Sequence, residues 1–179
     1  MTQPADLPQT GPSPRPGELR RATPEDAAEL YALSLRAIRG SAAGHYDAAQ
    51  LDAWAGARSI EQHQLLIEHT HTLLVVVDDA PAGFASLALE PWSKLERGEV
   101  DQLFVDPAFG GRGVARTLLT AVDAAAAEHG LDGLVTHASW RAAPVFERYG
   151  YAREEVETVH LDGQVLTRVR MRRRLPSSG

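Results

Sequence analysis

The sequence predicts a single α/β domain, built on one mixed β-sheet with helices on both faces. Three observations lead to this prediction. The chain has 179 residues, of which 44% are hydrophobic, and this is enough for one domain with a continuous core. Apolar patterns of strand and helix period alternate along it in an order typical of a sheet covered by helices. The stretch 100–128 places a glycine-rich turn between an apolar strand and an amphipathic helix.

The overall composition excludes several classes of protein. A net charge of −6 argues against non-specific nucleic-acid binding and allows a cationic substrate. The absence of cysteine excludes disulfides, thiolate catalysis and zinc–thiolate sites. No apolar run approaches the ~18 residues that span a membrane, and the first residues lack the pattern of a secretory signal or transit peptide. A cytoplasmic protein is therefore expected.

The ends of the chain are expected to lie outside the folded domain. The first 17 residues contain five prolines and almost nothing apolar, so a disordered N-terminal tail is expected over 1–17. The domain itself is expected over 18–174, followed by a C-terminal tail over 175–179.

Hydrophobic periodicity and turn residues predict the elements between these tails. Thr23 and Pro24 begin a helix that ends near Gly40, with Thr23 as the N-cap. Ser59 and Gln62 form a capping box that opens a later helix. The expected strands cover 18–22, 72–77, 84–89, 99–105, 134–138, 154–161 and 165–171; the other helices cover 48–55, 59–68, 115–128 and 140–148; and hairpin turns cover 78–83 and 162–163.

The glycine-rich turn has the properties of an anion site. The strand 100–105 breaks at Asp106-Pro107, and the chain then runs through Phe109-Gly110-Gly111-Arg112-Gly113 into the helix. The first N–H groups of a helix have no partner within it, and the helix dipole favours negative charge there. Glycine also lets phosphate oxygens approach the backbone closely. We therefore expect this turn to hold a phosphorylated cofactor.

Two signatures follow one another along the chain. A strand ends in Val105-Asp106-Pro107, and Gly113-Val114-Ala115 follows it; after the next strand come Ser139, Ala142, Phe146-Glu147-Arg148 and Gly150-Tyr151. Their order and spacing resemble the two signatures of the GNAT superfamily of acetyl-CoA-dependent N-acetyltransferases, over roughly 18–174. The resemblance implies the GNAT fold. This is a single mixed, mostly antiparallel sheet of about six to seven strands, flanked by helices, with a splay between the two central parallel strands.

The resemblance also implies acetyl-CoA as the co-substrate. The N–H groups of 111–115 would cradle its pyrophosphate, and the backbone of 103–105 would pair with its pantetheine arm and polarise the thioester carbonyl. Gly110 stands where the family has Gln or Arg, and Ser139 where it often has an asparagine that contacts the coenzyme. The expected cofactor residues are Leu103, Phe104, Val105, Gly110, Gly111, Arg112, Gly113, Val114, Ala115, Ser139 and Phe146.

Three residues are the catalytic candidates. Glu99 begins the central strand, where some family members carry a general-base glutamate, and it could accept the amine proton directly or through water. Asp101 lies two residues further on the same strand face, and two close carboxylates raise one pKa toward neutrality. Phe146 replaces the tyrosine with which many members protonate the leaving thiolate, so Tyr149, three residues on, is the substitute acid. The alternatives are solvated charges at a strand end, and a thiolate that leaves unassisted or by way of water.

The expected substrate pocket consists of Arg39, Tyr46, Trp54 and His137. Tyr46 and Trp54 lie in the helical segment where the family usually forms its acceptor pocket, and aromatic walls could hold an apolar or cationic acceptor. His137 lies near the expected gap between the parallel strands, as a base or as a substrate contact. For Trp54 and His137 the alternative is packing in the core.

No metal site is expected, because His63, His69 and His71 lack a persuasive ligand spacing with acids and are interpreted as solvated surface. The arginines of 168–174 alternate along the last strand and are interpreted as an exposed face that protects a sheet edge, with 172–174 as a basic, frayed end.

The sequence therefore predicts an N-acetyltransferase that moves an acetyl group from acetyl-CoA to the primary amine of a small molecule or peptide. Direct attack is expected, without an acyl-enzyme, since the chain has no cysteine to carry an acyl group. The alternatives are a catalytically degraded CoA-binding regulatory module, which Phe146 favours, and an acyltransferase with a different, longer acyl donor. No nucleic-acid or membrane partner is expected, and a homodimer is left open.

Overall fold

The structure is a computed structural model that describes residues 17–176, and a seven-stranded sheet runs through it. The strand order is β1-β2-β3-β4-β5-β7-β6, with β4 and β5 parallel and every other pair antiparallel. The strands are β1 Glu18–Arg21, β2 His71–Val77, β3 Ala80–Leu87, β4 Glu99–Val105, β5 Gly133–Ala138, β6 Ala152–Leu161 and β7 Gln164–Arg174. The predicted mixed sheet of six to seven strands is confirmed. The tails expected over 1–17 and 175–179 fall almost entirely outside the described residues.

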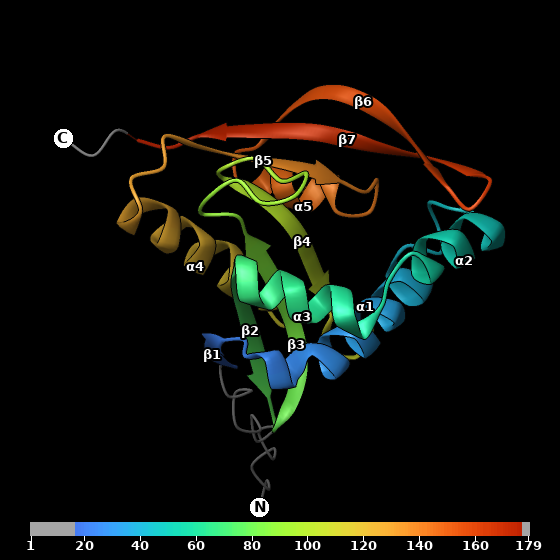
Figure 1. Ribbon diagram of the computed structural model, residues 1–179, viewed down its shortest axis with the longest axis horizontal. Coiled ribbons are helices and arrows are strands. Elements are labelled where there is room, and N and C mark those ends of the chain that lie inside the picture. The colour runs from blue at the N-terminus through green and yellow to red at the C-terminus, as the bar shows by residue number, and fades with distance from the viewer. Residues whose placement is uncertain (1–16, 177–179) are drawn as a thin grey trace, which may run out of the picture.

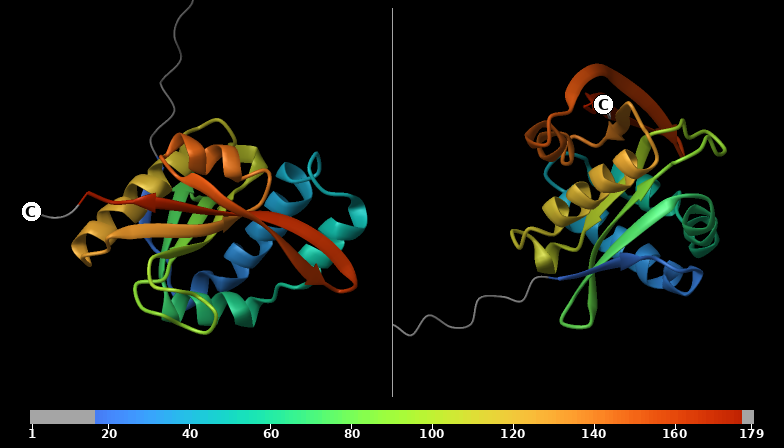
Figure 2. Two further views of the ribbon diagram at one scale, coloured as in Figure 1. Left: turned by 90° about the horizontal axis from the view of Figure 1, so that it is seen from above. Right: turned by 90° about the vertical axis from the view of Figure 1, so that its left-hand side faces the viewer.

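Helices cover both faces of this sheet (Figures 1 and 2). They are α1 Ala27–Ser41, α2 Ala48–Gly56, α3 Ile60–His69, α4 Val114–Glu128 and α5 Ala143–Arg148. Thr23 is the N-cap of the 3₁₀ turn that leads into α1, and Ser59 forms the predicted capping box with Gln62. No helix among residues 17–176 is long and apolar enough to cross a membrane.

Side chains of the central strands point alternately to the two faces of the sheet, and each face has its own hydrophobic core. Leu74 and Phe84 point to one face, where they pack with Leu30 and Leu33 of α1 and with Ile67 of α3. The residues that point to the other face form the larger core with α4 and α5, including Leu73, Val75, Ala85, Leu118, Leu119, Val122 and Phe146. Two covered faces explain why β2 and β3 are almost continuously apolar.

Several boundaries differ from the sequence-based expectation: β3 ends at Leu87, β6 begins at Ala152 and α5 begins at Ala143, where 89, 154 and 140 were expected. Two further differences change the sheet more. The turn expected over 78–83 is shorter, because Asp78 and Asp79 both adopt positive φ and close a two-residue hairpin from which β3 begins at Ala80. The basic end expected to fray at 172–174 instead belongs to β7 and pairs with β5. There Arg172 binds Glu154 and Arg173 binds Asp123 at 2.8 Å. β7 lies inside the sheet, so its arginines do not protect an edge; β6 is the edge strand on this side.

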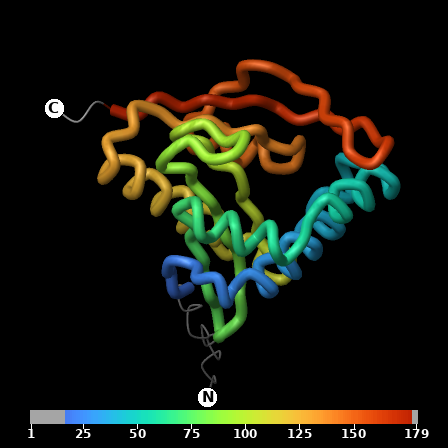
Figure 3. Tube along the Cα trace, in the orientation of Figure 1, coloured from blue at the N-terminus to red at the C-terminus, as the bar shows by residue number. Residues whose placement is uncertain are grey.

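The parallel strands β4 and β5 separate soon after they meet. They pair only at Glu99–Val135 and Val100–Thr136, and the Thr136 hydroxyl closes the junction by donating to the Val100 carbonyl at 2.8 Å. Beyond this point the β4 backbone has no partner on β5, as the predicted splay requires. The hairpin of β6 and β7 extends over the open side to α2 (Figure 3), where the Gln50 side chain donates to the Val165 carbonyl.

A β-bulge in β4 lies next to the splay. Leu87 of β3 pairs with Val100 and Ser86 pairs with Gln102, so Asp101 is an extra residue without a partner on β3. The Gln102 N–H donates instead to the Ser86 hydroxyl at 3.1 Å. Bulges of this kind bend a strand and redirect a side chain. The bulge therefore interrupts the plain alternation that would place Glu99 and Asp101 in the same surroundings.

Gly83 fixes how closely α4 approaches the sheet. A Cβ atom at Gly83 would lie 2.6 Å from Val114 Cγ1 and 2.8 Å from the Phe104 carbonyl oxygen. We expect Gly83→Ala to lower the free energy of unfolding by about 1–3 kcal/mol, as overpacking does, and to move the start of α4. Chemical denaturation measures this loss. Gly44→Ala is the matched control, because its Cβ would meet no atom within 4 Å; equal stabilities of the two variants would contradict the prediction.

Candidate active site

The turn before α4 opens onto a cleft between α1, β4 and α5. Gly111 and Gly113 adopt φ of 72° and 78°, the left-handed region that side chains disfavour, and open space lies where their Cβ atoms would be. The first bond of the helix joins the Thr117 N–H to the Gly113 carbonyl at 3.0 Å. The N–H groups of residues 114–116 precede it and are available to an anion. Backbone donors beside an open glycine turn are the groups that fit a pyrophosphate.

This cofactor cleft has a volume of about 620 Å³, and most of the expected cofactor residues line it: Leu103, Phe104, Val105, Gly110, Gly111, Gly113, Val114, Ala115 and Ser139. Arg112 is the exception in the turn, since its guanidinium lies over Phe109 and 3.8 Å from Asp78. Three cations that were not among the expected cofactor residues, Arg116, Arg141 and Arg148, also line the cleft. They surround it with positive charge suited to a phosphorylated ligand.

A second, smaller space lies on the other side of β4. This acceptor cavity of about 170 Å³ is bounded by α2, the splayed ends of β4 and β5, and the β6–β7 hairpin. Trp54, Leu103, Phe104, Ser139 and Ala142 line both this cavity and the cofactor cleft. The two spaces therefore meet where β4 and β5 separate.

Tyr46 connects the segments that enclose the acceptor cavity. Its hydroxyl donates to the Thr167 carbonyl at 2.8 Å and accepts from the Trp140 N–H at 3.2 Å. Its ring packs edge-on against Trp54, with centroids 5.5 Å apart. Tyr46 and Trp54 thus form a wall of the cavity, as expected, and the Tyr46 hydroxyl is already engaged.

Asp101 places a carboxyl group in the lining of the acceptor cavity. The bulge directs it into the cavity, where solvent reaches it. The protein around it nevertheless removes enough water to raise the pKa of its carboxyl, while the charges of Arg58, Arg168 and His137 oppose that rise. Burial is the main cause of the shift, and not a neighbouring carboxylate as the sequence suggested.

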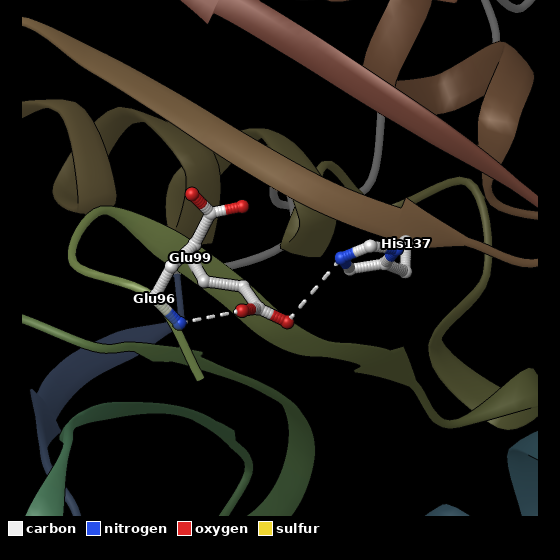
Figure 4. Close-up of side chains that lie close together, drawn as sticks. All are labelled: Glu96, Glu99 and His137. Atoms are coloured by element: carbon white, nitrogen blue, oxygen red, sulfur yellow. Dashed lines mark hydrogen bonds and ion pairs between the residues drawn. The ribbon is translucent and has the colours of Figure 1, made fainter. Parts of the chain in front are cut away.

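Glu99 lies behind this cavity, not in its lining. The residue is 6% exposed; Oε2 accepts from the Glu96 N–H at 2.9 Å, and Oε1 lies 3.8 Å from Nε2 of His137 (Figure 4). Burial raises the pKa of the Glu99 carboxyl, and the charge of Asp101 adds a smaller contribution. Between Glu99 and the cavity stands His137, which does line it.

His137 is held by a carboxylate on the neighbouring hairpin. Its Nδ1 lies 2.7 Å from Oε2 of Glu157, which also accepts from Arg168 Nε at 2.9 Å. Partial burial raises the pKa of Glu157, but these two hydrogen bonds, together with the charges of His137 and Arg168, lower it by more. An ionised Glu157 makes Nδ1 the donor and leaves Nε2 directed toward Glu99. No motif of the sequence indicates Glu157, because pairing across β6 and β7 brings it to the site.

One group of side chains has the spacing of a metal site. It consists of Glu96, Glu99 and His137, whose possible ligand atoms lie within 4.8 Å of one another. Protein groups already engage the two carboxylates, since Glu99 accepts from the Glu96 N–H and Glu96 binds Arg170 at 3.0 Å. The expectation that the protein uses no metal stays a prediction.

Other candidates lie elsewhere than the sequence suggested. Arg39 is exposed and lines neither space. Phe146 is buried and lines the acceptor cavity, not the cofactor cleft, while Tyr149 lines the cleft. His63, interpreted as solvated surface, is 2% exposed and packs between Tyr31 and Phe84.

Comparison with known protein families agrees with this geometry. Residues 42–174 match the family model described as an acetyltransferase (GNAT) domain. An uncharacterised N-acetyltransferase, YafP of Escherichia coli K12, is 30% identical over 155 residues, which are 87% of this chain and 94% of YafP.

Solved structures share the fold. A GCN5-related N-acetyltransferase from Rhodopseudomonas palustris superposes with a TM-score of 0.82 at 30% identity, over 91% of this chain and 98% of that one. The PaiA N-acetyltransferase of Thermoplasma acidophilum, solved in complex with coenzyme A, gives a TM-score of 0.70 at 16% identity, over 88% and 98% of the two chains. At that identity the second likeness concerns the fold alone.

Proposed function

The chain belongs to the GNAT family of N-acetyltransferases, and on that premise we propose that it moves an acetyl group from acetyl-CoA to a primary amine of a small molecule or peptide. One observation supports this best: the cofactor cleft and the acceptor cavity meet at Trp54, Leu103, Phe104, Ser139 and Ala142. A thioester that lies along β4 and an amine in the acceptor cavity would face each other at this junction. Bringing two reactants together in this way is itself a large part of catalysis.

On the donor side, the chain supplies mainly backbone groups. The N–H groups at the start of α4 would bind the pyrophosphate, and Arg116, Arg141 and Arg148 would attract the phosphorylated ligand. The β4 backbone beyond Val100 has no partner on β5, so it is free to pair with the pantetheine arm and to polarise the thioester carbonyl.

On the acceptor side, Asp101 would take the proton that the ammonium must lose. The amine nitrogen then bonds to the carbonyl carbon, and the carbon–sulfur bond breaks. The thiolate leaves with a proton from Tyr149 or from water, and the nitrogen releases its remaining extra proton to water, which restores the proton of Tyr149. Among the predicted bases, Asp101 lines the cavity and Glu99 reaches it only through His137. We therefore assign the direct role to Asp101 and a supporting role to Glu99.

Two alternatives remain open to test. Phe146 lacks a hydroxyl where many family members have one, which favours a CoA-binding regulatory module; a longer acyl donor would fit the same cleft. Thiol release across a panel of amines, with acetyl-CoA and longer acyl-CoA donors, separates them. Turnover of an amine with acetyl-CoA is expected. A raised melting temperature with acetyl-CoA but no turnover would favour the regulatory module, and no stabilisation at all would overturn the cofactor assignment.

Tyr149→Phe tests the proposed acid. We expect it to lower kcat by about 10-fold, less than the 10²–10⁴-fold of typical general acids, because a thiol of pKa ~8.5 is a good leaving group. Stopped-flow measurement of thiol release reads this step. Tyr31→Phe is the control, since Tyr31 lines neither space; equal rates for the two variants would show that water, not Tyr149, supplies the proton.

A further inference from the structure

Arg58 is a half-buried cation in the wall of the acceptor cavity, and it belongs to no motif of the sequence. It lies in the short connection between α2 and α3. Its guanidinium stacks 4.7 Å above the ring of Phe104, and one terminal nitrogen donates to Gln102 Oε1 at 3.2 Å. Its Nε is buried and has no hydrogen-bond partner among residues 17–176. Part of the donor capacity of Arg58 is therefore unused.

The charge of Arg58 is also uncompensated at close range. No carboxylate oxygen of the described residues lies within 4 Å of its guanidinium, whereas Arg168 in the same cavity binds Glu157. Burial lowers the pKa of Arg58 to about 10, and Asp101 acts on it only as a nearby charge. Arg58 thus remains a cation at neutral pH. A cation that is partly removed from water without a bonded anion is costly, and a guanidinium is well shaped to bind a carboxylate.

We propose that Arg58 binds a carboxylate of the acceptor, and that the acceptor is a small amino acid whose amine faces Asp101. This inference rests on the proposed N-acetyltransferase function. The cavity then offers a cation for the carboxylate and a carboxyl group for the ammonium, both on its wall. Its volume of about 170 Å³ suits a small acceptor, because pockets for drug-sized ligands hold roughly 300–1,000 Å³.

The alternative role for Arg58 is electrostatic support of Asp101, whose pKa it lowers. The two roles differ in what they predict for neutral amines. Support of Asp101 affects every amine by the same factor, whereas a carboxylate contact affects only amines that carry the carboxylate.

The test compares each of the twenty amino acids with its carboxamide, which keeps the amine and also stands for a peptide N-terminus. We expect the wild-type protein to favour the best amino acid over its carboxamide by at least about 10-fold in kcat/KM, the value of one charge-assisted contact. Arg58→Gln should reduce that ratio to near one, and Arg58→Lys should keep part of it. Arg39→Gln is the matched control, since Arg39 is exposed outside both spaces and should leave the ratio unchanged. Stabilisation by acetyl-CoA confirms that each variant is folded.

The outcomes separate the inference from the function on which it rests. Turnover of carboxamides without a preference for amino acids would overturn the inference and leave the acetyltransferase in place. A preference for amino acids over carboxamides that survives in Arg58→Gln would also overturn it. So would an equal loss of kcat/KM for amino acids and carboxamides, together with a shifted pH profile. If no amine of either kind were acetylated, the proposed function itself would fail, and the inference with it.

Discussion

Asp101→Asn is expected to lower kcat/KM by about 10²–10⁴-fold, the range for loss of a general base. The bulge in β4 turns Asp101 into the acceptor cavity, where Arg58, Arg168 and His137 act on its charge. An amide cannot accept the proton that the attacking ammonium loses. Steady-state kinetics with the best amine of the panel measure the loss, and acetyl-CoA binding should be unchanged because the variant alters only the acceptor side.

The pH dependence gives the same prediction a second readout. The Asp101 carboxyl must be ionised to act as a base, and burial raises its pKa above the ordinary 3.8. The activity of the wild-type protein should therefore fall as the pH drops through this raised pKa, and Asp101→Asn should lack that acid limb. Glu99→Gln should cause a smaller loss, since Glu99 reaches the cavity only through His137. A larger loss in Glu99→Gln than in Asp101→Asn would assign the base to Glu99.

The same pKa shift predicts the stability of the variant. A carboxyl whose pKa is raised on folding contributes stability at pH values below its unfolded pKa, and this stability is lost as the pH rises through the folded pKa. At neutral pH the ionised Asp101 therefore disfavours the folded state, so Asp101→Asn should melt no lower than the wild-type protein. A lower melting temperature at pH 7 would show that the lost activity reflects unfolding and not the loss of a base.

Gly113→Ala is expected to weaken acetyl-CoA binding by about 10–100-fold. Gly113 adopts φ of 78° at the N-cap of α4, a conformation that costs any residue with a Cβ roughly 1–2 kcal/mol. Relief of that strain would turn the N–H groups that follow it, and loss of one charge-assisted hydrogen bond costs about 1.5–3 kcal/mol. Isothermal titration with acetyl-CoA measures the loss.

Gly130→Ala is the matched control for this variant. Gly130 follows the other end of α4, adopts φ of 62° and, like Gly113, has no atom within 4 Å of the position a Cβ would take. Both variants should lose a similar amount of stability, but only Gly113→Ala should lose affinity for acetyl-CoA. An equal affinity in the two variants would show that the turn does not bind the cofactor.

Much of the fold was accessible from the sequence, because hydrophobic period and capping residues are local. The capping box at Ser59, the turn at Asp162-Gly163 and the strand–turn–helix around Gly113 all form where the sequence places them. The length of β7 was not accessible in this way. A run of arginines is typical of a solvated end, whereas here the backbone of 172–174 pairs with β5, and Arg172 and Arg173 bind the distant Glu154 and Asp123.

In the site, too, the parts that depend on local sequence could be predicted and the parts that depend on distant contacts could not. The donor side depends on a contiguous glycine turn, and most of its residues could be named in advance. The acceptor side depends on contacts between distant segments. The direction of Asp101 follows from how β4 pairs with β3, and His137 is positioned by Glu157 from an adjacent hairpin. Arg58 lies outside any motif, and its significance arises only from burial in a cavity formed by other elements.

The most direct test of direct transfer measures free thiol, acetylated amine and acetylated protein in one reaction of the full-length chain with acetyl-CoA and the best amine. Thiol and acetylated amine should form in equal amounts, with no acetyl group on the protein at any time, and both should fall together in Asp101→Asn. Thiol release without acetylated amine, or an acetylated protein that forms before the product, would contradict direct attack of the amine.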